Sequence, residues 1–119
     1  MVRKLTINRD KLVPRVRLWL EYNGKPVIGR GGAEILAAIN QNKSISGAAN
    51  SLSISYRFLW NYLEKMRARL GEPPVETFKG GFKGGGGARL TETGKILLEE
   101  YKNGENLILA ALGRKVSLK

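Results

Sequence analysis

A tract of glycines in the second half of this 119-residue chain limits what the surrounding residues can form. Residues 80–87 read GGFKGGGG, so six of these eight positions are glycine. Glycine loses more backbone freedom on folding than any other residue, and such a tract weakens any helix or strand that contains it. The tract can therefore be a disordered linker, a loop that cradles phosphate, or the tip of a hairpin.

The residues on either side of the tract favour the hairpin. VETFK before it and ARL after it both have strand character, and Thr91 can cap a helix that begins directly afterwards. A disordered linker would not lead at once into a capped helix. The phosphate-loop pattern G-x-x-x-x-G-K-[ST] is absent, and no helix follows the glycines directly. We predict a two-stranded hairpin, or wing, over residues 75–90.

Apolar periodicity predicts the other elements of the chain. VRLWLEY alternates in period two and leads into Asn23-Gly24, a strong turn signal, which predicts an N-terminal β-hairpin over residues 16–28. Residues 1–15 form a basic N-terminal arm, and residues 16–119 form one domain. Apolar residues at helical spacing predict helices over residues 32–42, 46–52, 56–70 and 92–112.

Three residues mark the expected ends of these helices. Ser46 is a suitable N-cap for the helix 46–52, because its hydroxyl can accept a hydrogen bond from the first turn. Gly71 ends the helix 56–70, and Thr91 begins the last helix. The fold class is then α+β, mostly α, with the element order of a winged helix-turn-helix. The long last helix carries an apolar stripe made of Leu97, Tyr101, Ile108 and Leu112, a candidate dimer interface.

Charge is the strongest indication of a partner. The chain has 21 Lys and Arg against 10 Asp and Glu, a net charge of +11. With a pI near 10.3, it has the electrostatic character of a nucleic-acid-binding domain. A basic surface that serves only solubility is the plain alternative, although acidic residues serve solubility better. No basic amphipathic helix of the kind that lies on membranes stands out.

The composition also argues against an enzyme. Histidine and cysteine are both absent, which removes thiol catalysis, histidine general bases and most zinc sites. The few acidic residues show no paired arrangement, so we expect no catalytic residues, no metal site and no cofactor. No secretory signal or membrane span is apparent, which makes the cytoplasm, in association with the nucleoid, the expected location.

In a winged helix-turn-helix, the second helix of the pair lies in the major groove of DNA. Here that is the helix 56–70. With Leu59 and Leu63 facing the core, Arg57 and Asn61 face outward, and these side chains can pair with guanine and adenine respectively. A solvated helix face is the alternative for both residues. The candidate DNA-binding residues are Ser46, Ser55, Tyr56, Arg57, Trp60, Asn61, Lys79, Lys83, Gly84, Gly85 and Arg89.

Two segments, SISGAANSLSISYRFLW and VETFKGGFKGGGGARLTETG, resemble the DNA-binding domain of the molybdate-responsive regulator family, ModE. The resemblance covers about residues 16–112, and the glycine-rich run is its most specific part. It implies a LysR-like winged helix-turn-helix that dimerises partly through the long last helix. It also implies that Ser55, Tyr56 and Arg57 lie near DNA and that the wing lies on the backbone. That family commonly carries C-terminal molybdate-binding domains, but we expect none in these 119 residues, and Phe82 and Lys83 depart from its glycine pattern.

These observations predict a regulator that binds double-stranded DNA as a homodimer. The alternative is an architectural protein that binds DNA with little sequence specificity through the same surface. A module that binds only other proteins is less consistent with the net charge of +11.

Overall fold

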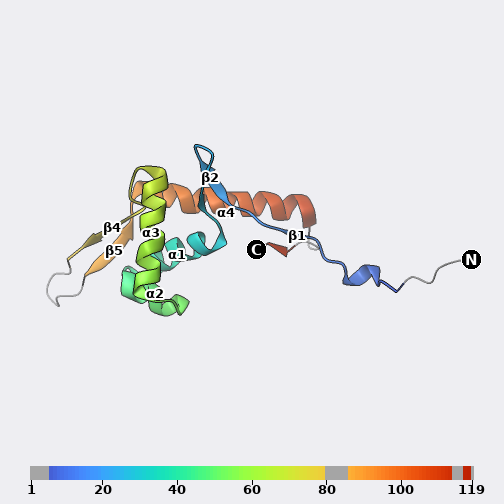
Figure 1. Cartoon of the computed structure of the whole chain (residues 1–119), viewed down its shortest axis with the longest axis horizontal. Helices are drawn as coiled ribbons and strands as arrows, with labels where there is room; N and C mark the ends of the chain where they lie inside the picture. The colour runs from blue at the N-terminus through green and yellow to red at the C-terminus, as the bar shows by residue number, and fades with distance from the viewer. Residues whose placement is uncertain (1–5, 80–85, 114–116, 119) are drawn as a thin grey trace, which may run out of the picture.

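Helices dominate the fold, and short two-stranded sheets are attached to them (Figure 1). The computed structural model describes residues 6–79, 86–113 and 117–118. In chain order the elements are η1 Arg9–Lys11, β1 Arg15–Val16, β2 Leu20–Tyr22, β3 Lys25–Ile28, α1 Arg30–Asn42, α2 Ile45–Leu52, α3 Tyr56–Leu70, β4 Val75–Phe78, β5 Gly87–Leu90, α4 Glu92–Leu112 and β6 Ser117–Leu118. This is the mostly helical α+β architecture that the sequence predicts.

Helix α1 lies at the centre of the hydrophobic core. Its residues Leu36 and Ile39 are completely buried, and it contacts α2, α4, β3 and β5. Leu59 and Met66 of α3 belong to the same core cluster. Because α1 contacts both α2 and β5, it fixes the helix pair and the wing relative to each other.

The ends of the helices follow from individual side chains. The Ser55 hydroxyl accepts a hydrogen bond from the Phe58 N–H at 3.0 Å, and α3 ends at Gly71, whose φ of 80° is left-handed. Thr91 caps α4 by accepting a hydrogen bond from Gly94 N–H. The prediction that Ser46 caps α2 is wrong. Ser44 is the cap, because its backbone is extended and its hydroxyl accepts a hydrogen bond from Gly47 N–H at 2.9 Å.

The N-terminal hairpin is shorter than predicted. Asn23 and Gly24 form the turn with positive φ values of 51° and 79°, and β2 pairs with β3 around it. The alternating residues before Leu20 do not continue β2, because β3 is only four residues long and the register shifts between Leu20 and Glu21. Instead, β1 forms a separate two-residue parallel pair with β6.

The molecule is elongated along α4. Its principal extents are 79 × 31 × 23 Å, and its radius of gyration of 19.0 Å exceeds the about 13–14 Å of a compact chain of this length. The wing lies at one end and the N-terminal arm at the other (Figure 1). Among the described residues, none of the helices has both the length and the apolar composition needed to cross a membrane.

Candidate nucleic-acid interface

Helices α2 and α3 form a helix-turn-helix with a tight connection. Ser53 adopts the left-handed conformation with φ 56°, and the next residue, Ile54, donates its N–H to the carbonyl oxygen of Ala49 at 3.0 Å. Ser55 then caps α3, so only three residues separate the two helices. This short turn fixes the direction in which α3 leaves α2.

One face of α3 is anchored and the opposite face is exposed. Leu59 and Leu63 are buried in the core, whereas Arg57 and Asn61 are exposed, as the helical spacing predicts. Glu64, on the same exposed side, forms an ion pair with Arg67 at 3.1 Å. Arg57 and Asn61 are therefore accessible to a molecule lying along α3.

A hollow of about 250 Å³ opens where the helix pair meets the wing. Tyr56 and Trp60 lie in it with their rings stacked, 6.4 Å apart and 6° from parallel. This wing-base hollow brings together α2, α3, β4 and β5, and its lining includes Ser44, Ser46, Tyr56, Trp60, Thr77, Phe78 and Gly87. Three of the predicted DNA-binding residues line this hollow: Ser46, Tyr56 and Trp60.

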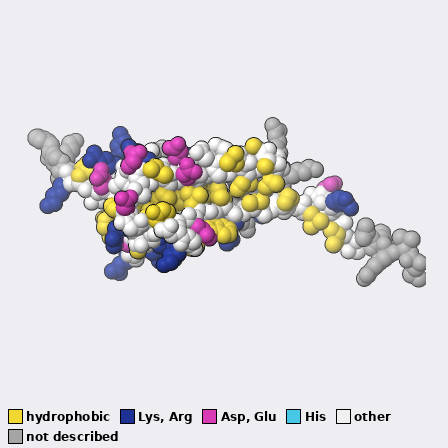
Figure 2. All heavy atoms as spheres, turned by 90° about the horizontal axis from the view of Figure 1, so that it is seen from above, with side chains coloured by type: hydrophobic (Ala, Val, Ile, Leu, Met, Phe, Trp, Pro, Cys, Tyr) yellow, Lys and Arg dark blue, Asp and Glu magenta, His cyan; other side chains and the backbone are white. Residues whose placement is uncertain are grey.

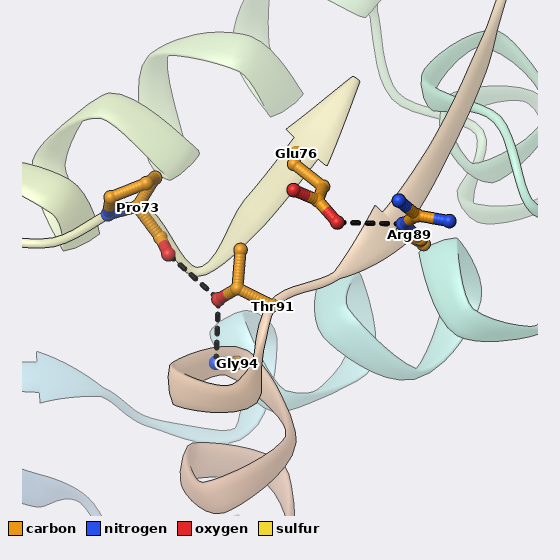
Figure 3. Close-up of polar contacts among 5 residues, drawn as sticks. All are labelled: Pro73, Glu76, Arg89, Thr91 and Gly94. Carbon is orange, nitrogen blue, oxygen red and sulfur yellow. Dashed lines mark hydrogen bonds and ion pairs between the residues drawn. The ribbon is translucent and has the colours of Figure 1, made fainter. Parts of the chain in front are cut away.

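The wing strands hold their side chains in a defined register. Glu76 and Arg89 are direct cross-strand neighbours and form an ion pair at 2.6 Å (Figure 3). The Arg89 guanidinium also lies 5.3 Å from the centre of the Phe78 ring. Exposed ion pairs contribute only about 0–1 kcal/mol, so this pair does not prevent Arg89 from binding an anion.

The end of the glycine tract has a steric role. A Cβ on Gly87 would overlap the far edge of the Phe78 ring, so a larger residue at this position would displace that ring. Lys79, at the other side of the wing, is exposed. The predicted contacts at Lys83, Gly84 and Gly85 lie outside the described residues.

Contacts at its base tie the wing to the rest of the fold. The Thr91 hydroxyl donates to the carbonyl oxygen of Pro73 at 2.7 Å while accepting from Gly94 N–H at 3.2 Å (Figure 3). Gly94 itself is buried, and a Cβ there would overlap the carbonyl oxygen of Pro74. The start of α4 is thus packed directly against the segment that leads into β4.

The apolar stripe of α4 is only partly available to a partner. Leu97 and Tyr101 are 9% and 2% exposed, because they pack in the core of their own chain. Little of either side chain is left to contact a partner, and their place in a dimer interface stays a prediction. Beyond Gly104 the apolar residues are less covered: Ile108 is half-buried and Leu112 is exposed. Figure 2 shows hydrophobic side chains running along this face of the molecule.

Several residues of the interface were not predicted from the sequence. Ser44, Thr77 and Phe78 line the wing-base hollow, and only the hairpin register could have indicated the last two. Pairing the residues on either side of the glycine tract opposes Thr77 to Ala88 and Phe78 to Gly87. Ser44, at the N-terminus of α2, lies beside these strands only because of tertiary packing, which the sequence does not indicate.

The chain is similar to known regulators and molybdenum-binding proteins. It is 33% identical over 96 residues to the molybdenum-pterin-binding protein MopA of Rhodobacter capsulatus, which covers 81% of this chain and 36% of MopA. It is 43% identical over 75 residues to MopB of the same organism, covering 60% of this chain and 27% of MopB. It is 40% identical over 67 residues to the transcriptional regulator ModE of Yersinia pestis, covering 56% of this chain and 25% of ModE. The chain thus spans between a quarter and about a third of the length of these relatives. No protein-family model matches it.

Solved structures show the same fold at low sequence identity. The DNA-binding domain of CbnR, crystallised with DNA, aligns with a TM-score of 0.52 and 20% identity, covering 68% of this chain and 86% of that domain. A MarR family transcription regulator aligns with a TM-score of 0.57 and 16% identity, covering 71% of this chain and 56% of the regulator. The chain therefore has a winged helix-turn-helix fold, shared with these DNA-binding domains, and is homologous to part of the MopA, MopB and ModE proteins.

Proposed function

We propose that this domain binds double-stranded DNA in a transcriptional regulator, with α3 in the major groove and the wing on the sugar-phosphate backbone. The observation that carries the proposal is the wing-base hollow, where the N-termini of α2 and α3 meet β4 and β5 beside the exposed Arg57. Homology to the regulator ModE and the shared fold with a DNA-bound domain support the same function.

The two parts of the surface suit different parts of DNA. Arg57 and Asn61 have the side-chain types that read guanine and adenine edges in the major groove. The wing-base hollow offers the hydroxyl groups of Ser46, Tyr56 and Thr77, which can donate to phosphate oxygens. With Lys79 and Arg89 on the wing, phosphate contacts position the domain and α3 supplies specificity.

We propose that a second copy of the chain covers the outer half of α4. Ile108 and Leu112 extend the stripe that Leu97 and Tyr101 begin, but the chain's own core covers only the first half. Leu109, 43% exposed, adds to the uncovered half. A dimer of this kind would present two copies of α3, which predicts DNA half-sites about 34–36 Å apart or a multiple of that.

A weakly specific architectural protein is the second candidate, favoured by the net charge of +11 and the wing. Selection of random duplex DNA at about 0.15 M salt, followed by sequencing, distinguishes the two. An enriched palindrome with half-sites one turn apart supports the regulator. Retention without any enriched motif supports the architectural protein, and no retention of DNA contradicts both. Either role would place the protein with the chromosome in the cytoplasm.

A further inference from the structure

A second hollow lies on the other flank of α3, and of the residues that line it only Asn61 is among the proposed DNA contacts. It lies between α3 and the β2–β3 hairpin, and we call it the hairpin hollow. Its volume of about 530 Å³ is in the range of about 300–1,000 Å³ typical of small-molecule sites. The residues that give it its chemistry are Trp19, Pro26, Phe58, Tyr62, Lys65 and Arg69.

The walls of the hairpin hollow are aromatic. Trp19 and Phe58 are 48% and 55% exposed, an unusual state for large apolar side chains brought together on one surface. Phe58 contacts Tyr62 with ring centres 6.3 Å apart and planes tilted by 53°. The Trp19 indole N–H donates to Glu21 Oε2 at 3.0 Å, which fixes the orientation of the indole. Such walls suit a flat, apolar molecule.

The charge of the lining is positive. Lys65 and Arg69 are one helical turn apart on the same side of α3, and Asn61 adds an amide at the edge. Arg69 donates through Nη1 to the carbonyl oxygen of Pro26, which holds its guanidinium against the hairpin. No Asp or Glu is among the described residues that line this hollow. The Glu21 carboxylate is held by its hydrogen bond from the Trp19 indole N–H.

We propose that the hairpin hollow binds a small aromatic carboxylate. The ring system would lie against Trp19 and Phe58, and the carboxylate would accept hydrogen bonds from Lys65. Charge-assisted hydrogen bonds of this kind are stronger than those between neutral groups, so an anion is preferred over a neutral molecule of the same shape. Because Phe58 and Lys65 belong to the proposed recognition helix, such a ligand would contact α3 directly.

The test uses 2-naphthoate as the probe and the two tryptophans of the chain as reporters. In a proton–nitrogen correlation spectrum, each indole N–H gives one signal, assigned with Trp19→Phe and Trp60→Phe. The proposal predicts a saturable shift of the Trp19 signal, whereas the Trp60 signal stays in place because Trp60 lies on the opposite flank of α3. The neutral 2-naphthamide is expected to bind about tenfold more weakly or worse.

Two variants and one control complete the test. Lys65→Gln is expected to reduce naphthoate affinity about tenfold, and Phe58→Ala is expected to abolish saturation. Lys102→Gln, which removes an exposed lysine from α4, should leave affinity unchanged. Equal binding of naphthoate and naphthamide, or an unaltered affinity in Lys65→Gln, would overturn the proposal. Absence of a saturable shift of the Trp19 signal with naphthoate would likewise overturn it.

Discussion

The backbone N–H of Ala88 donates to the carbonyl oxygen of Lys43 at 2.9 Å. Ala88 faces Thr77 of β4 across the wing, whereas Lys43 ends α1 in the left-handed conformation with φ 60°. Strand β5 is therefore held on one side by its partner strand and on the other by the turn between α1 and α2. This bond sets the position of the wing relative to the helix-turn-helix.

Gly94 is expected to tolerate no side chain. In Gly94→Ala the new Cβ would overlap the Pro74 carbonyl oxygen, and because that oxygen belongs to the backbone, relief requires the wing base to move. We expect a loss of roughly 1–3 kcal/mol or more in the free energy of unfolding, measured by urea denaturation. Gly31→Ala is the control, since its Cβ would meet only the Tyr62 hydroxyl at 3.8 Å. An equally stable Gly94→Ala protein would contradict this packing.

The Thr91 hydroxyl both caps α4 and joins it to the wing. Thr91→Val keeps the shape of the side chain but removes the bonds to Gly94 N–H and to the Pro73 carbonyl oxygen. The loss of the cap should lower the free energy of unfolding by about 1–2 kcal/mol. Thr91→Ser retains the hydroxyl and should lose much less. If the two variants were equally stable in urea, neither bond would matter to the fold.

Arg57 and Lys79 are expected to affect DNA binding differently. Arg57→Ala should reduce the preference for the selected site over random DNA by about 1–3 kcal/mol, because a base contact is lost. Lys79→Ala should weaken binding to all sequences and lower the slope of log K against log salt by about one. Titrations at several salt concentrations measure both quantities. Equal, sequence-independent losses in the two variants would exclude base reading by Arg57.

The outer half of α4 can be tested by placing charges on its apolar side. In Leu109→Lys/Leu112→Lys both replaced side chains are already exposed, so the monomer should still fold. Two buried leucines contribute about 1.5–3 kcal/mol each, so the dimer dissociation constant should rise about a hundredfold or more. Light scattering over a range of protein concentrations reports the mass. Asn103→Lys/Ala110→Lys adds the same charge to the opposite, exposed face, and its dimer should persist.

Stability at alkaline pH is expected to depend on Tyr101. Burial, together with the nearby Glu105 carboxylate, raises the pKa of Tyr101 above its ordinary value of 10.0. The folded state therefore favours the neutral phenol: its contribution is complete below pH about 10 and is lost as the pH rises through the higher folded-state pKa. In Tyr101→Phe the loss of stability above pH about 10 should be smaller than in the wild type. Urea midpoints at neutral and alkaline pH measure the difference, with the exposed Tyr56→Phe as control.

For this chain the sequence predicts secondary structure better than it predicts tertiary contacts. Helices α3 and α4 span the ranges expected from their apolar spacing, because Gly71 and Thr91 mark their ends. At α2 two serines lie two positions apart, and only the tertiary structure selects Ser44 as the cap. The parallel pair of β1 and β6 joins residues about a hundred positions apart, for which no local signal exists.

In the candidate site, too, the sequence predicts local features but not tertiary packing. Exposure of Arg57 follows from the helical period, but the burial of Leu97 and Tyr101 does not. A stripe of apolar residues has the same spacing whether it faces its own core or a partner. In α4 the first half of the stripe is buried in the chain's own core, whereas Leu109 and Leu112 of the second half are exposed, and the spacing does not distinguish the two halves.

The pairing of β1 with β6 has a consequence for longer proteins that contain this domain. It brings residues 117–118 beside residues 15–16, at a distance from the wing (Figure 1). A sensory unit attached after Leu118 would therefore begin away from the DNA-facing end of the molecule. Helix α4 joins that end of the molecule to the wing, because its first turn is packed against the wing base.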